Sequence, residues 1–71
     1  MTDQTAIHSY AAAIRRRLAK VQPDYHGIAQ ELHGAQCMAL ALGDGGAAAI
    51  ISDLHAEVTA AWRADEQRGA A

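Results

Sequence analysis

The segment between Pro23 and Leu42 limits the possible folds most, because it is patterned for a helix that is apolar on two sides. At about 100° per residue, one stripe of this helix gathers five apolar positions: Ile28, Leu32, Ala35, Ala39 and Leu42. The opposite side and one flank carry a second set: Cys37, Leu40, Ala41 and Met38. One neighbouring helix would cover only one of these sides, so the segment predicts cover from more than one direction.

Two further segments have helical periodicity. The first, over residues 3–20, has these residues on one face: Ile7, Tyr10, Ala11, Ile14, Leu18 and Val21. The second, over residues 47–66, has a face made of Ala47, Ile50, Ile51, Leu54, Val58, Ala61 and Trp62. No strand pattern appears elsewhere, so the chain is expected to be all-α.

Turn signals separate the three helical segments. Pro23 disfavours helical geometry in the residue before it and suits the first position of the following helix. Three glycines between positions 43 and 46 predict a tight reversal, with Asp44 available to cap the last helix. We therefore predict a small three-helix antiparallel bundle with helices over 3–20, 23–42 and 47–66.

The whole chain, residues 1–71, is expected to form a single domain, with residues 67–71 frayed. Gly34 leaves one alternative open, since it could break the middle segment into two shorter helices. In an unbroken helix, Gly27, Gly34 and Ala41 are spaced seven apart, which predicts a shallow groove where another helix could approach closely.

Composition favours self-association. Of 71 residues, 51% are hydrophobic, but half of these are alanine and phenylalanine is absent. Such a chain has few bulky side chains for a core, and small domains often complete their burial by forming oligomers. We expect a homodimer that forms through the second helix.

Charge and cysteine content exclude several classes of protein. The formal net charge of −2 gives no general attraction to nucleic acid or to an anionic membrane. A single cysteine cannot form an intramolecular disulfide, no secretion signal is apparent, and no apolar run is suited to spanning a bilayer. These features predict a cytoplasmic protein with no membrane partner.

Residue types that can bind metal ions form a stripe along one face of the middle segment. His26, His33 and Cys37 share one helical face, and imidazole and thiolate one turn apart suit Zn²⁺, Ni²⁺ or Cu⁺. His55 or a second copy of the chain would have to complete the ligand set. Because two or three ligands from one helix leave a tetrahedral set incomplete, only weak binding is expected, and no resident cofactor.

A DNA-binding alternative uses the basic end of the first segment, where Arg15, Arg16, Arg17 and Lys20 could contact phosphates. The stretch from Ile28 to Gly34 resembles the first helix and turn of a helix-turn-helix DNA-binding domain. The resemblance covers about ten residues, and its glycine lies one position later than in that family. The recognition helix that it implies, residues 35–42, has no charged side chain to read base edges.

Catalytic patterns are absent from the sequence. Asp53, His55 and Glu57 alternate along the last segment, so a helix points them in three directions. The chain is therefore not expected to be an enzyme.

A protein-contact function is favoured by the surplus of large apolar residues outside the predicted core. These residues are Cys37, Met38, Leu40 and Trp62. Methionine and aromatic side chains outside a core stripe are typical of contact patches. We expect a small helical regulator or adaptor that binds a protein partner through this apolar helix face, although Trp62 could instead pack inside the bundle on Ile7 or Tyr10.

Overall fold

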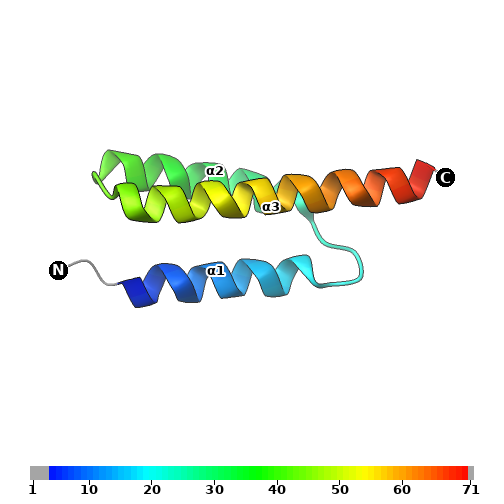
Figure 1. The fold of residues 1–71 in the computed structure, drawn as a ribbon, viewed down its shortest axis with the longest axis horizontal. Helices are drawn as coiled ribbons and strands as arrows, with labels where there is room; N and C mark the ends of the chain where they lie inside the picture. Colours follow the sequence, from blue (N-terminus) through cyan, green and yellow to red (C-terminus); the bar gives the residue numbers. More distant parts are fainter. Residues whose placement is uncertain (1–3, 71) are drawn as a thin grey trace.

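The computed structural model describes residues 4–70 of the chain. It contains three helices, α1 (Gln4–Leu18), α2 (Tyr25–Ala41) and α3 (Gly45–Ala70), and no strand within the described residues (Figure 1). This confirms the predicted all-α fold with three helices. Residue 3, where the first helix was predicted to begin, lies outside the described residues.

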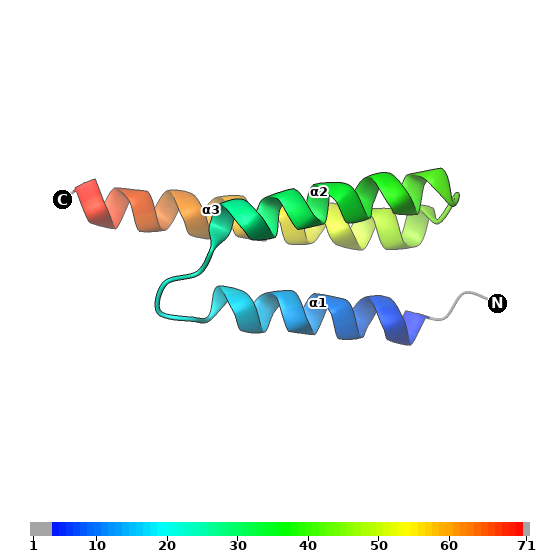
Figure 2. The same ribbon diagram turned by 180° about the vertical axis from the view of Figure 1, so that it is seen from behind.

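The molecule is a narrow rod. Its principal extents are 48 × 19 × 15 Å, and α2 and α3 lie side by side with α1 along them (Figures 1 and 2). The chain runs out along α1, returns along α2 and runs out again along α3 (Figure 1). With 26 residues against the 17 of α2, α3 is the longest helix, about 39 Å at 1.5 Å per residue. Its C-terminal part therefore extends beyond the other helices.

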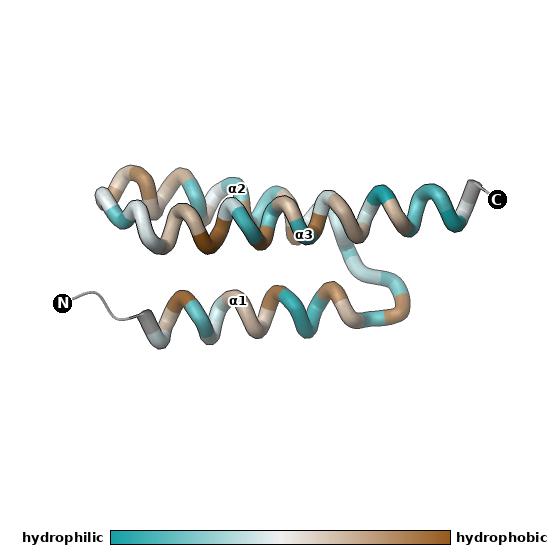
Figure 3. Tube along the Cα trace, in the orientation of Figure 1, coloured by the Kyte–Doolittle hydropathy of each residue, from teal (hydrophilic) through white to brown (hydrophobic). Residues whose placement is uncertain are grey.

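The helix with two closely packed neighbours is α3, whereas the sequence predicted the middle helix for that role. Both α2 and α1 pack mainly against α3. Apolar positions line the sides of α1 and α3 that face each other (Figure 3). The buried core comprises Ala11 and Ile14 of α1, Ile28, Leu32 and Ala39 of α2, and Ala48, Ile51, Leu54 and Val58 of α3.

The corner between α2 and α3 is as tight as its glycines predict. Gly43 has a φ of +76°, a left-handed conformation that glycine adopts without strain. Its N–H donates to the carbonyl of Leu40 at 3.1 Å, and the N–H of Asp44 donates to that of Ala39 at 2.9 Å. These two bonds form a Schellman motif. The Asp44 carboxylate then accepts from the N–H of Ala47 at 3.0 Å, so α3 begins at Gly45 instead of residue 47.

The N-terminus of α2 is capped by Asp24, and Pro23 lies before the helix, so the predicted start at residue 23 is two residues early. The Asp24 carboxylate accepts from the N–H of Gly27 at 3.1 Å. A Cβ at position 27 would lie only 2.2 Å from the Asp24 Oδ2 atom, so the cap in this position depends on glycine there.

Two predicted core residues are exposed. Val21 is 99% exposed and Leu42 is 76% exposed. Val21 lies three residues beyond the end of α1 at Leu18, so the helical register does not extend to it. Leu42 keeps a helical backbone as the C-cap of α2, with its N–H donating to the carbonyl of Met38 at 3.0 Å, but it is the last residue before the reversal and is left uncovered.

Two other differences concern helix length. Gly34 lies inside an unbroken α2, and α3 continues through residues 67–70, which were predicted to fray. The sequence after Trp62 contains no proline, and Arg68 pairs with Asp65 one turn earlier at 3.0 Å, a spacing that supports a helix.

Candidate functional site

The C-terminal part of α2 presents large apolar side chains to solvent. Met38 is 62% exposed, Leu40 61% and Leu42 76%, and Val21 is the one other large hydrophobic residue exposed within residues 4–70. Cys37 is also exposed. No Asp, Glu, Lys or Arg occurs from Leu32 to Gly43. An uncharged apolar surface therefore covers the last two turns of α2, and we call it the α2 end surface.

Three of the predicted contact residues lie on this surface. Because Leu32 and Ala39 face the core, helical geometry places Leu40 on one flank of α2, Met38 on the other and Cys37 between them. Next to Cys37, a Cβ at Gly34 would meet no atom within 4 Å. The predicted groove of Gly27, Gly34 and Ala41 is interrupted, however, because the Asp24 carboxylate fills the space at Gly27.

Trp62 lies elsewhere. Its ring stacks on Tyr25, with centroids 6.0 Å apart and an angle of 11°, and meets the edge of His26 at 6.3 Å. These partners are at the start of α2, and eleven residues of helix, about 16 Å, separate His26 from Cys37. The structure therefore separates Trp62 from the other three predicted contact residues, and its ring partners belong to α2 and not to α1.

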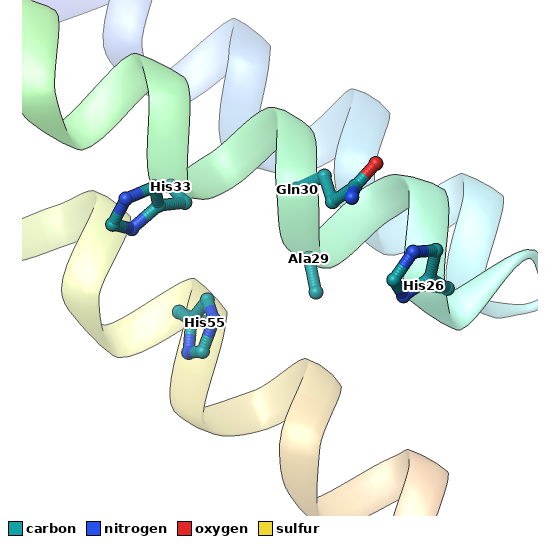
Figure 4. A pocket seen from close by; sticks show the side chains of 5 residues that line it. All are labelled: His26, Ala29, Gln30, His33 and His55. Carbon is teal, nitrogen blue, oxygen red and sulfur yellow. The ribbon is translucent and has the colours of Figure 1, made fainter.

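A groove lies between α2 and α3, with a volume of about 470 Å³. Its lining consists of His26, Ala29, Gln30, His33 and His55. Figure 4 shows the three histidines around the small side chain of Ala29, with His55 contributed by α3. The sequence analysis placed His26 and His33 on one face but did not predict a groove. The signal that it missed is the small Ala29 within the i, i+3, i+4, i+7 set formed by residues 26, 29, 30 and 33.

The predicted metal ligands are not gathered into a metal site. Within the described residues no group of three or more His, Cys, Asp or Glu side chains is placed to hold an ion. The Cys37 Sγ atom lies 3.8 Å from the Nε2 atom of His33. His26, seven positions before His33, is displaced by about 10 Å along the helix. The chain thus offers a pair of ligands, half of a tetrahedral set.

The basic end of α1 makes contacts within the protein. Arg15 donates from Nε and Nη2 to the two carboxylate oxygens of Glu57 on α3, at 3.3 and 2.9 Å. Arg17 forms an ion pair with Glu31 on α2. Hydrogen bonding to these carboxylates raises the pKa of both guanidinium groups. Two of the four predicted phosphate contacts therefore hold α1 to the other helices, while Arg16 and Lys20 remain exposed.

The resemblance to a helix-turn-helix domain does not extend to the structure. Residues 28–34 lie within continuous α2, with no turn at Gly34. On α3, His55 lines the groove and Glu57 pairs with Arg15, so these two side chains point to different parts of the surface.

A buried hydroxyl lies near the Arg17–Glu31 pair. The Tyr10 hydroxyl is buried and has no hydrogen-bond partner within the described residues. Burial raises the pKa of Tyr10, and the negative charge of Glu31 raises it further, against a smaller opposite effect of Arg17. Sequence periodicity placed Tyr10 on the core face but gave no indication of this unsatisfied group.

Comparison with known protein families, with curated proteins and with solved structures finds no significant match to this chain. Within residues 4–70, no helix combines the length and apolar character needed to cross a membrane.

Proposed function

We propose that this protein is a small antiparallel three-helix regulator or adaptor that acts by binding another protein chain through the α2 end surface. The observation that carries the proposal is the exposure of Met38, Leu40 and Leu42 on the last turns of a helix with no charge in that region. The self-association expected from the small core takes place, in this proposal, on the same surface.

The physical chemistry of the α2 end surface supports a protein as the occupant. The centres of protein interfaces are poor in charged residues and rich in methionine and other large apolar side chains. Full burial of a leucine or methionine side chain contributes about 1.5–3 kcal/mol relative to exposure. Three such side chains within five positions of the chain, each more than half exposed, leave apolar area that a protein contact would remove from water.

The DNA-binding alternative has less support, since Arg15 and Arg17 already have carboxylate partners. Only Arg16 and Lys20 of that group are left to neutralise phosphates. A steep fall of DNA affinity with rising salt would be needed to favour this alternative.

The test compares the parent with one double variant and one single variant by sedimentation equilibrium at high micromolar protein concentration. The parent should sediment as a dimer, and Met38→Gln/Leu40→Gln should sediment as a monomer with unchanged helix content by circular dichroism. Val21→Gln is the matched control, because it removes an exposed hydrophobic residue from the loop and should leave the dimer intact. A dimer unaffected by the double substitution would contradict the proposed surface, and a monomeric parent would contradict the proposed self-association.

A further inference from the structure

His33 and Cys37 lie next to each other on the exposed side of α2. Four positions, just over one helical turn, separate them, and the Cys37 Sγ atom is 3.8 Å from the Nε2 atom of His33. Both residues are exposed, and no Asp, Glu, Lys or Arg occurs from Leu32 to Gly43. A ring nitrogen and a sulfur atom are therefore open together to an ion from solvent.

The separation of these two atoms is close to that of two ligands on one Zn²⁺ ion. Zinc binds cysteine sulfur at about 2.3 Å and histidine nitrogen at about 2.0–2.1 Å in a tetrahedral arrangement. A sulfur and a nitrogen at the tetrahedral angle are then roughly 3.5–3.6 Å apart. The distance in the structure, 3.8 Å, is only slightly longer. A small rotation of either side chain brings both atoms onto one ion, and the helix backbone does not have to move.

We propose that His33 and Cys37 form a two-residue site for one Zn²⁺ ion, with the remaining positions of the ion left to water or to an external ligand. Zinc accepts both nitrogen and sulfur ligands. The Cys37 thiol binds as the thiolate and gives its proton to the solvent, and His33 binds through the lone pair of a neutral ring.

The surroundings leave room for an ion that keeps its own water molecules. A Cβ at Gly34, which lies between the two ligands in the chain, would meet no atom within 4 Å. On the other side of His33 is the groove of about 470 Å³ between α2 and α3 (Figure 4). The ion can therefore enter and leave without any opening of the helices.

The other two histidines of the groove are not ligands in this proposal. His26 is about 10 Å from His33 along the helix. His55 lines the groove from α3, but no group of three metal-binding side chains forms within residues 4–70. Structural and catalytic zinc sites use four or three protein ligands, so a site with two binds zinc more weakly and exchanges it with solvent. The inference does not depend on the proposed function.

The experiment titrates Co²⁺, a spectroscopic substitute for zinc, into the full chain with its thiol kept reduced under argon. A sulfur-to-cobalt charge-transfer band should appear, saturate at one ion per chain and disappear when Zn²⁺ is added. Cys37→Ser should abolish the band. His33→Gln should weaken binding by about tenfold or more, since loss of groups that only orient a ligand already costs about 10–100-fold in metal affinity.

His55→Gln is the matched control, because it removes an imidazole from the same groove and should leave the affinity unchanged. None of the three substituted residues is part of the buried core, so each variant should keep the helix content of the parent by circular dichroism. A parent without the charge-transfer band would overturn the proposal, as would binding that His33→Gln does not weaken. Equal weakening by His55→Gln, or one ion for every two chains, would overturn the assignment to two residues of a single chain.

Discussion

Arg15 of α1 and Glu57 of α3 are joined by two hydrogen bonds, although 42 positions separate them in the chain. Together with the Arg17–Glu31 pair, this contact holds the first helix against the α2–α3 hairpin. All four side chains are well exposed, so water weakens each ion pair. The pairs therefore add little to overall stability beside the buried Ala11 and Ile14, through which α1 joins the core.

The first prediction concerns this attachment. Glu57→Gln should increase amide hydrogen exchange in α1, because the helix loses a charged partner on α3, and should change the melting temperature only slightly. Asp53→Gln is the control, since Asp53 is exposed on the same helix and is not part of either pair. Equal exchange in α1 for both variants would show that the Arg15–Glu57 contact does not hold the helix.

The second prediction concerns the core. Leu32 is fully buried, so Leu32→Ala should lower the free energy of unfolding by about 2–5 kcal/mol. Leu32→Asp should unfold the domain, since it buries a charge without a partner. Arg16→Ala should leave the free energy of unfolding nearly unchanged, as measured by chemical denaturation monitored by circular dichroism. A melting temperature for Leu32→Asp close to that of the parent would show that α2 faces the core differently.

The third prediction compares two glycines of α2. Gly34→Ala should raise the free energy of unfolding by about 0.5–1 kcal/mol, because a Cβ there meets nothing within 4 Å and alanine is the better helix former. Gly27→Ala should gain nothing or lose stability, since its Cβ would displace the Asp24 cap. Urea denaturation measures both, and equal gains from the two variants would contradict the role of the cap.

The fourth prediction concerns Tyr10 and alkaline pH. Tyr10→Phe should raise the free energy of unfolding at neutral pH by about 1 kcal/mol, since it removes a buried hydroxyl without a partner. The folded pKa of Tyr10 lies above its ordinary value of 10.0. Below pH 10 the phenol is neutral in both the folded and the unfolded state, so it adds no pH dependence to the stability there.

As the pH rises through 10 toward the folded pKa, the unfolded chain loses the Tyr10 proton first. The parent should therefore lose stability over this interval, and Tyr10→Phe should lose less. Urea denaturation from pH 8 to pH 11 measures the difference. Parallel curves for the two proteins would show that the hydroxyl is not buried in solution.

The core was largely predictable because it depends on local periodicity. Ile14, Leu32 and Leu54 are buried as the 3.6-residue pattern requires, and the glycine-rich corner forms at the predicted place. The prediction that Val21 and Leu42 belong to the core was wrong, because periodicity does not show where a helix ends. Val21 lies three residues beyond the end of α1, and Leu42 is the C-cap of α2, so each lies where the packed part of its helix has ended.

The contacts made by surface side chains could not be predicted, because they depend on information that the sequence pattern does not contain. Whether Arg15 meets a phosphate or Glu57 is decided by how α1 lies along α3. The stacking of Trp62 on Tyr25 likewise depends on the alignment of α3 with the start of α2. Periodicity gives the face of each residue, but contacts across helices require the relative positions of the helices along their axes.

The central claim is that the α2 end surface is covered by another protein chain, and methyl NMR with a soluble paramagnetic probe tests it most directly. Leu40 and Val21 are both exposed in the single chain. As the protein concentration rises, signal broadening by the probe should fall for the methyl groups of Leu40 and stay high for those of Val21. If the Leu40 methyl groups remain as accessible as those of Val21 at every concentration, or if protection appears at Val21 instead, the proposed contact surface is wrong.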